Sequence, residues 1–229
     1  MKRRHVAGSL SAFLVVLGFF ISASVGCAQE SPEKITRLKN GVVIVTTFDE
    51  RGKPLLQGSG FFIDTDQIVT NFHVIQNASR IRVETFNRIV STVSAILATD
   101  EKSDLALLRL SEPSHLSTVL PLKTTAVAEG DSVTVISNPQ NYQWKVTRGS
   151  TGLLWEFHGL GERLQITAAI SPGSSGGPVL DADGQVVAIA SMYFNSLENL
   201  SFAVPVARLQ ALQLKALNLR RRFNGLALD

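Results

Sequence analysis

Cysteine is almost absent from this chain of 229 residues, and the single one, Cys27, lies at the end of an apolar N-terminal stretch. The rest of the chain therefore contains no thiol, which excludes a disulfide framework. Its stability must come from a hydrophobic core, and about 200 residues are enough to bury one.

A true charge excess is also lacking. The formal net charge is +3, but Lys2, Arg3 and Arg4 belong to the N-terminal stretch, and without them 19 basic residues face 19 acidic ones. Nothing in this balance predicts nucleic-acid binding. The one basic cluster, at 220–222, ends an expected helix, where cations favour the negative end of the helix dipole. A solvated helix end is the simpler interpretation, and a membrane-surface patch is the alternative.

Residues 1–28 have the features of a targeting segment, with a basic start, an apolar run over 6–25 and small residues near Ala28. A cleaved signal peptide is one interpretation. Lipidation at Cys27, as in bacterial lipoproteins, is a second. A retained membrane anchor is a third, since about 20 apolar residues can span a bilayer. All three predict an exported protein, either periplasmic or secreted.

The remaining chain alternates short β-rich runs with turn signals, a pattern typical of an all-β barrel or sandwich. The clearest runs are 42–48, 60–63, 68–71, 81–85, 105–110, 133–137, 186–191 and 202–204. Only residues 206–223 are expected to be helical, with an apolar stripe of Leu209, Leu212, Leu217 and the alanines of the segment. The segment Ser111–Ser117 is the best linker, and it divides the β-rich region into two similar halves.

Three glycines crowd around Ser174 and Ser175 in the stretch 170–178. Glycine at this density suits a tight loop whose N–H groups point inward. A serine in such a loop can be a nucleophile, and the adjacent N–H groups can stabilise the oxyanion that it creates. A plain turn between strands is the alternative interpretation.

No histidine follows this loop, because all four histidines of the chain precede it. The α/β-hydrolase nucleophile elbow, whose G-x-S-x-G pattern residues 173–177 also match, needs a histidine after the serine. The chymotrypsin-like barrels use the order His, Asp, Ser, which this chain can supply.

His73 is the candidate base, because a β-rich run ends near it and would place the imidazole at a strand end. A histidine satisfied within the core is the alternative. His115 lies in the expected linker and His158 in an expected loop, and both are predicted to be solvated surface groups. His5 belongs to the targeting segment.

Asp104 is the candidate acid, because it directly precedes the apolar run 105–110, which would hold its backbone firmly. Its carboxylate would accept the Nδ1–H of His73 and stabilise the imidazolium that forms. Asp100 lies in a looser segment and is predicted to be a solvated turn residue.

Five motifs together resemble the protease domain of the HtrA (Do-like) trypsin-fold serine peptidases over about residues 35–215. They are Gly58–Ile63, Ile68–Val74, Ser103–Leu108, Gly173–Leu180 and Ser201–Pro205. The resemblance implies a catalytic triad of His73, Asp104 and Ser175, since Ser175 directly precedes Gly-Gly-Pro. It also implies an oxyanion hole made by the main-chain N–H groups of Gly173 and Ser175.

The chain departs from the family pattern in three places. Ser174 stands where the family commonly has asparagine, Ser137 stands where it commonly has glycine, and the loop 140–145 lacks the usual glycine. We expect a protease domain alone, without the peptide-binding PDZ domain that many relatives carry. The oxyanion donors are main-chain groups, so the change at Ser174 is expected to be tolerated.

The resemblance implies an all-β fold of two chymotrypsin-like six-stranded β-barrels followed by a C-terminal helix. We expect residues 29–113 to form the first barrel, 114–205 the second, and 206–229 the helix and tail. His73 and Asp104 then come from the first barrel and Ser175 from the second, so the site should lie between them.

The implied function is that of a serine endopeptidase that hydrolyses unfolded or exported proteins in protein quality control. The primary specificity pocket would be lined by Ile170, Ala190, Ser191 and Met192, which offer no acidic side chain, so small aliphatic side chains are expected there. Ser191 is also expected to hydrogen-bond the Asp104 carboxylate. No metal or cofactor is expected, and the family suggests a homotrimer. A peptide-binding or chaperone-like module without proteolysis is the rival hypothesis.

Overall fold

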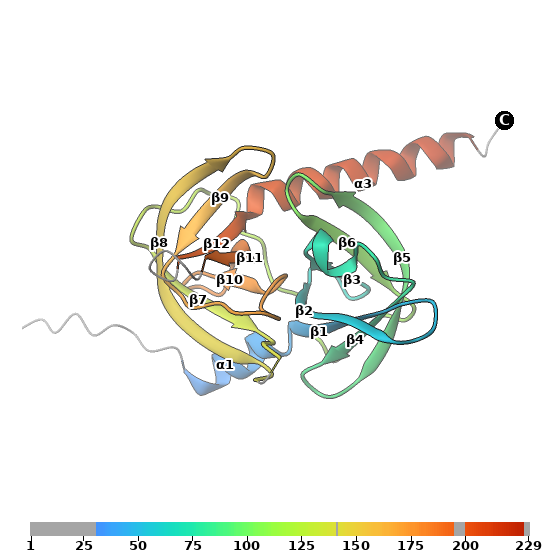
Figure 1. Ribbon diagram of the computed structural model, residues 1–229, viewed down its shortest axis with the longest axis horizontal. Coiled ribbons are helices and arrows are strands. Elements are labelled where there is room, and N and C mark those ends of the chain that lie inside the picture. The colour runs from blue at the N-terminus through green and yellow to red at the C-terminus, as the bar shows by residue number, and fades with distance from the viewer. Residues whose placement is uncertain (1–30, 141, 195–199, 227–229) are drawn as a thin grey trace, which may run out of the picture.

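Two closed antiparallel β-barrels lie side by side in the computed structural model, and a long C-terminal helix lies across both (Figure 1). The structure describes residues 31–140, 142–194 and 200–226, with side chains described over 31–140, 142–191 and 200–218. The expected targeting segment therefore lies outside the described residues. The two-barrel fold predicted from the sequence is confirmed.

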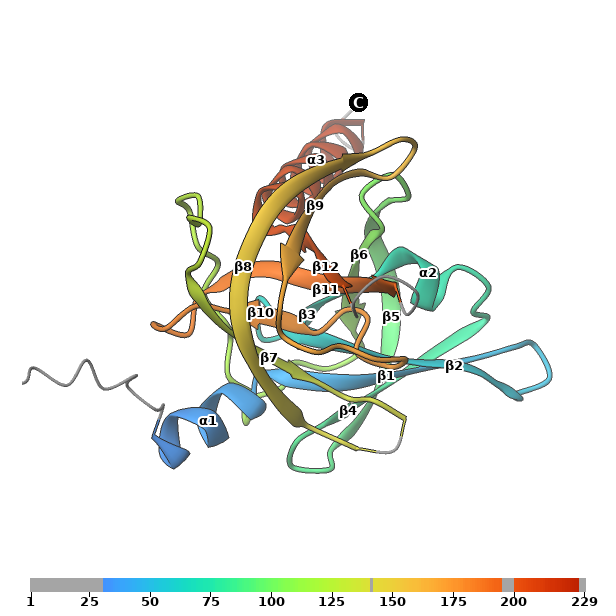
Figure 2. The same cartoon turned by 60° about the vertical axis from the view of Figure 1, so that its left-hand side comes forward.

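The first barrel closes in the order β1-β2-β3-β6-β5-β4, and the second in the order β10-β11-β12-β9-β8-β7. The first contains β1 (Val42–Phe48), β2 (Pro54–Phe62), β3 (Gln67–Thr70), β4 (Arg80–Thr85), β5 (Val90–Asp100) and β6 (Leu105–Leu110). The second contains β7 (Ser132–Ser137), β8 (Lys145–Phe157), β9 (Gly161–Ile166), β10 (Pro178–Leu180), β11 (Val186–Phe194) and β12 (Leu200–Pro205). The long strand β8 curves around the outside of the second barrel (Figure 2).

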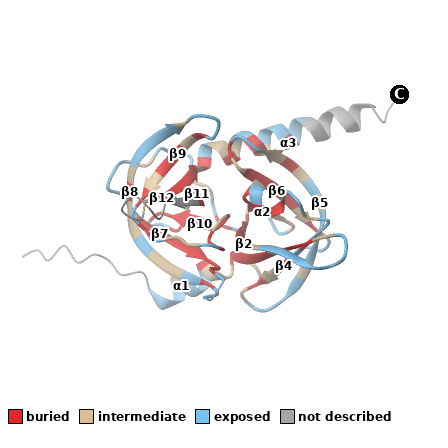
Figure 3. Ribbon diagram, viewed as in Figure 1, coloured by how far each residue is buried: buried red, intermediate tan, exposed pale blue. Residues whose placement is uncertain are grey.

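Strand β1 is buried on both faces, which explains the continuous apolar run Val42–Val45 at its start. Val43 and Val45 point into the core of the first barrel. Val42 and Ile44 belong instead to a cluster shared with Leu180 and other residues of the second barrel. Figure 3 shows buried residues concentrated on the strands of both barrels and exposed residues on the connecting loops. The apolar residues of β1 therefore join the two barrels into one unit.

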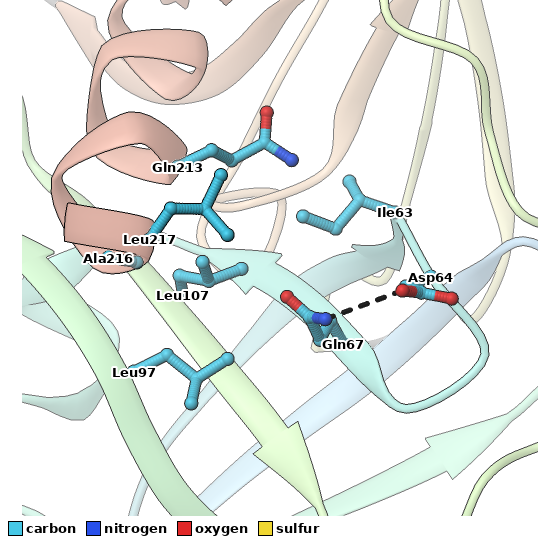
Figure 4. A pocket seen from close by; sticks show the side chains of 8 residues that line it. All are labelled: Ile63, Asp64, Gln67, Leu97, Leu107, Gln213, Ala216 and Leu217. Atoms are coloured by element: carbon cyan, nitrogen blue, oxygen red, sulfur yellow. Dashed lines mark hydrogen bonds between the residues drawn. The ribbon is translucent and has the colours of Figure 1, made fainter. Parts of the chain in front are cut away.

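Helix α3 (Val206–Leu226) packs on the barrels through Leu209, Leu212 and Ala216, all of which are buried. The expected stripe is wrong at Leu217, which is 51 % exposed, because the spacing from Leu212 places Ala216 on the inner face instead. A cavity of about 190 Å³ lies between this helix and the first barrel, with Gln67 and its partner Asp64 at one end (Figure 4). No helix in the described ranges is both long and apolar enough to cross a bilayer.

The expectation that only one segment is helical is wrong. Helix α1 (Pro32–Lys39) starts at Ser31, whose side chain accepts a hydrogen bond from the Lys34 N–H, and proline occupies its first turn. Helix α2 (Phe72–Ile75) has only four residues, too few to show a helical period. His73 therefore lies in a short helix after β3 and not at the strand end.

The turn after β10 is fixed by Asp181, which is 8 % exposed and accepts hydrogen bonds from two main-chain N–H groups. The ammonium of Lys123 lies 2.7 Å from its carboxylate. Burial disfavours the charged form of Asp181, but the hydrogen bonds from Lys123 and from the main chain outweigh burial and lower the pKa of Asp181. Helix α1 packs on this turn, where Lys34 donates a hydrogen bond to the carbonyl of Ala182.

Candidate active site

The His73 side chain is paired with the Asp104 carboxylate. Its Nδ1 lies 2.9 Å from Oδ2 and 3.0 Å from Oδ1 of Asp104, and the His73 main-chain N–H donates to Oδ1 at 2.9 Å. A carboxylate can only accept here, so the neutral imidazole carries its proton on Nδ1 and leaves Nε2 as an acceptor. The sequence predicts this hydrogen bond, and the structure contains it. The imidazole remains 45 % exposed, so Nε2 is open to a reacting group.

Asp104 is held from several directions. Its φ of 57° lies in the left-handed region, which aspartate tolerates better than most residues. Its N–H donates to the Glu101 carbonyl at 3.1 Å, and its carbonyl accepts from Asn71 Nδ2 at 2.8 Å. Asp100 closes the preceding turn by accepting a hydrogen bond from the Ser103 N–H. Asp100 also ends β5, so it is part of a strand and not of a loose segment.

The two serines of the glycine-rich loop have different surroundings. Ser174 is 1 % exposed, and its hydroxyl accepts hydrogen bonds from Ser137 Oγ at 3.0 Å and from the Ser171 N–H at 3.2 Å. Two residues that depart from the family pattern, Ser137 and Ser174, therefore contact each other. Ser175 is half-buried, so it is the more accessible serine of the two.

Ser191 connects Ser175 to the histidine–aspartate pair. Its hydroxyl donates to Asp104 Oδ2 at 2.8 Å, as the sequence resemblance leads us to expect, and its carbonyl accepts from Ser175 Oγ at 3.1 Å. Among the described residues, the hydroxyl of Ser175 makes this hydrogen bond and none to His73. Ser191 thus contacts Asp104 through its hydroxyl and Ser175 through its main-chain carbonyl.

Gly58 lets the helix of His73 approach the loop of Ser175. A β-carbon added at Gly58 would lie 2.8 Å from Val74 Cγ2 and 3.1 Å from the carbonyl oxygen of Ser175. Any larger residue would force the two segments apart. The glycine of the first predicted motif therefore serves the packing of the site.

The main chain of the serine loop turns sharply at Gly173. Gly173 has a φ of 94°, and a β-carbon there would lie 2.7 Å from the Asn138 carbonyl, so only glycine fits. In the part of the chain that the structure describes, neither the N–H of Gly173 nor that of Ser175 donates a hydrogen bond. Two such donors are the elements of an oxyanion hole.

Ser59 ties this loop to the first barrel. Its N–H donates to the Ser175 carbonyl at 2.7 Å, and its hydroxyl donates to the Gly173 carbonyl at 2.8 Å. The same hydroxyl accepts from the Asn138 N–H at 2.8 Å. The candidate nucleophile is consequently fixed by residues of both barrels.

The predicted specificity residues differ in accessibility. Ile170 is half-buried, and Ala190 is fully buried, with its N–H and carbonyl bound to Gly177 and Gly176. Met192 lies on β11, but its side chain is outside the described part of the structure. The described residues bring no three His, Cys, Asp or Glu side chains together as metal ligands.

A hollow of about 260 Å³ adjoins the pair, and it is lined by His73, Asp104, Ser191 and, unexpectedly, Arg163. Arg163 is a residue of β9 and is only 1 % exposed. Sequence reasoning misses it because a single arginine in a strand normally points to solvent. Nothing in the local sequence indicates that this one faces the site.

Two six-stranded barrels with a His–Asp pair on one and a serine loop on the other are the architecture of a trypsin-like peptidase. Residues 58–189 match the family described as the trypsin-like peptidase domain, and the chain belongs to that family. The chain is 34 % identical to the probable periplasmic serine endoprotease DegP-like of Bartonella henselae over 69 % of its own length and 32 % of the relative. It is 31 % identical to the anti-sigma-I factor RsgI9 of Acetivibrio thermocellus over 77 % of its length and 26 % of that protein.

A crystal structure of the serine endoprotease from Yersinia pestis superposes with a TM-score of 0.72 at 28 % identity, covering 83 % of this chain and 68 % of that one. The resemblance to the HtrA (Do-like) peptidases is thereby confirmed at the level of family and fold. The chain spans about a quarter to a third of the two curated relatives.

Proposed function

We propose that this protein is a serine endopeptidase in which His73, Asp104 and Ser175 act as a triad. The observation that carries the proposal is the pairing of His73 Nδ1 with Asp104 Oδ2 at 2.9 Å, with the Ser191 hydroxyl as a further donor to the same carboxylate at 2.8 Å. It fixes the tautomer of the imidazole and leaves Nε2 free to accept a proton. Family membership supports the same chemistry.

In the proposed reaction, Ser175 Oγ attacks the scissile carbonyl while His73 Nε2 takes its proton and later gives it to the leaving amine. The Ser175 hydroxyl must first rotate from the Ser191 carbonyl to His73. Catalytic hydrogen bonds commonly tighten only when substrate binds, so a hydroxyl turned aside before binding is consistent with this step. The N–H groups of Gly173 and Ser175 stabilise the oxyanion of the tetrahedral intermediate.

The proposed substrates are unfolded or exported polypeptides with small aliphatic side chains before the scissile bond. Ile170 and Ala190 support this specificity because neither carries a charge that could pair with lysine or arginine. The relationship to a periplasmic DegP-like endoprotease supports action outside the cytoplasm. In a library of peptides, cleavage mainly after lysine or arginine would contradict the proposed specificity.

Labelling with a fluorophosphonate tests the function, because the reagent needs an activated serine and no known substrate. The full chain should be labelled, and Ser175→Ala should abolish both labelling and casein cleavage, by a factor of at least about 10⁴ in kcat. Ser174→Ala is the matched control and should retain both. Labelling that depends on Ser174 and not on Ser175 would reassign the nucleophile.

A second candidate function is peptide binding without cleavage. It is favoured by one observation, the bond of the Ser175 hydroxyl to Ser191 in place of His73. A chain that binds unfolded casein but resists the fluorophosphonate at every pH would support this candidate against the first.

A further inference from the structure

Arg163 is buried beside the His73–Asp104 pair, and no carboxylate of the described residues forms an ion pair with it. Its Nη1 donates to the neighbouring Glu162 carbonyl at 2.9 Å, and its Nε has no hydrogen-bond partner among the described residues. Burial of a charged group with an unpaired N–H is costly. An arginine that only served stability would be better replaced by an apolar side chain of similar size.

The remaining contact of Arg163 crosses from the second barrel to the first. Its Nη2 lies 3.4 Å from the carbonyl oxygen of Lys102, two residues before Asp104. The segment from Glu101 to Asp104 makes the turn that puts Asp104 into its left-handed conformation. The guanidinium therefore holds the turn that orients the Asp104 carboxylate.

The charged groups around Arg163 are mostly acidic, which suits a buried guanidinium at this place. Asp104, Asp100 and Glu156 attract the guanidinium and Arg208 repels it, while Glu101 lines the same hollow. Burial lowers the pKa of Arg163, and the negative charge of Asp104 acts against that shift.

We propose that Arg163 is a positioning residue for the His73–Asp104 pair, an inference that rests on the proposed peptidase function. By holding the Lys102 carbonyl it keeps the Asp104 carboxylate against His73 Nδ1 across the junction of the barrels. It touches neither the substrate nor the nucleophile. Its contribution acts through the orientation of the imidazole, so it affects the chemical step and not substrate binding.

The test compares Arg163→Met with the wild-type full chain on a peptide substrate. We expect kcat to fall about tenfold while KM stays within about twofold, because orientation matters in the transition state and not for binding. Arg163→Lys keeps the charge and one donor and should recover about a third of the wild-type kcat. Arg109→Met is the matched control, because Arg109 pairs with Asp66, 3.4 Å away, and does not line the hollow.

A proton NMR spectrum tests the inference independently of catalysis. The proton shared by His73 Nδ1 and Asp104 should give a low-field signal in the wild type and in Arg109→Met, and the signal should be weakened or lost in Arg163→Met. This measurement remains valid even if the wild type is not labelled by a fluorophosphonate, so failure of the proposed function is distinguishable. If Arg163→Met does not fold, Arg163→Gln takes its place. A folded variant with wild-type kcat and an unchanged signal would overturn the proposal.

Discussion

Replacement of Gly176 by alanine is the sharpest structural test of the site. Gly176 follows the candidate nucleophile and has a φ of 88°. A β-carbon there would overlap the Ser59 carbonyl oxygen and lie 2.5 Å from Thr70 Oγ1. Gly130 has a nearly identical φ of 87° but no atom within 4 Å of such a carbon, so Gly130→Ala is a control for backbone strain alone.

The expected loss in the free energy of unfolding of Gly176→Ala has two parts. The left-handed conformation costs alanine about 1–2 kcal/mol, and this part is common to both variants. At Gly176 the overlap must also push β2 away from the loop, which breaks the 2.7 Å hydrogen bonds from the Ser59 N–H to Ser175 and from Thr70 Oγ to Ser59. Each buried hydrogen bond lost costs about 1–3 kcal/mol, so Gly176→Ala should lose about 2–6 kcal/mol more than the control.

Urea denaturation of the full chain, followed by tryptophan fluorescence, measures both free energies of unfolding. The same samples give the fluorophosphonate labelling rate, which should be lost in Gly176→Ala and kept in Gly130→Ala. A difference in stability below about 1 kcal/mol would refute the reasoning, because the loop could then move away from β2 without losing those hydrogen bonds.

Three further changes test other parts of the structure. Ser174→Ala should lower the free energy of unfolding, measured in urea, by about 1–3 kcal/mol, since it removes the acceptor of two hydrogen bonds. A variant as stable as the wild type would contradict this role. Leu209→Ala, fully buried on α3, should cost about 2–5 kcal/mol, whereas Leu214→Ala, 62 % exposed on the same helix, should cost less than about 0.5 kcal/mol; similar losses would show that the helix is not packed as described. In the folded state, burial raises the pKa of Asp181, but its hydrogen bond from Lys123 helps to lower that pKa overall. The ionised Asp181 therefore stabilises the fold at any pH above the pKa of this residue in the unfolded chain, and this stabilisation is lost on acidification. Urea titrations from neutral pH to pH 3 should therefore show a smaller loss of stability for Asp181→Asn than for the wild type, and equal losses would contradict the assignment.

The strands that the sequence predicts best are those buried on one or both faces. The bounds of β1 and β6 agree with the expectation because both strands are mostly apolar or β-branched and are followed by polar turn residues. Strands β5 and β8 are missed because they are largely exposed, so their polar residues interrupt any apolar run. In such strands the pairing with neighbours determines the conformation, and a single sequence does not show that pairing.

The pairing of His73 with Asp104 is predictable because each residue follows or precedes a recognisable strand. The position of Arg163 is not predictable, since its contact with Lys102 joins residues 61 positions apart on different barrels. The Ser137–Ser174 contact is also hidden from the sequence, although both residues are recognisable as departures from the family pattern. Long-range polar contacts leave no periodic trace in a chain.

The triple attachment of Ser59 has a consequence for how the molecule denatures. Its two donated hydrogen bonds hold the loop of the reactive serine, so the halves cannot drift apart while that loop stays ordered. A transient separation of the barrels would expose the Ser59 amide to deuterium exchange and would release the loop of Ser175 in the same event. The order of the serine loop is therefore coupled to the docking of the two barrels, so loss of one is expected to accompany loss of the other.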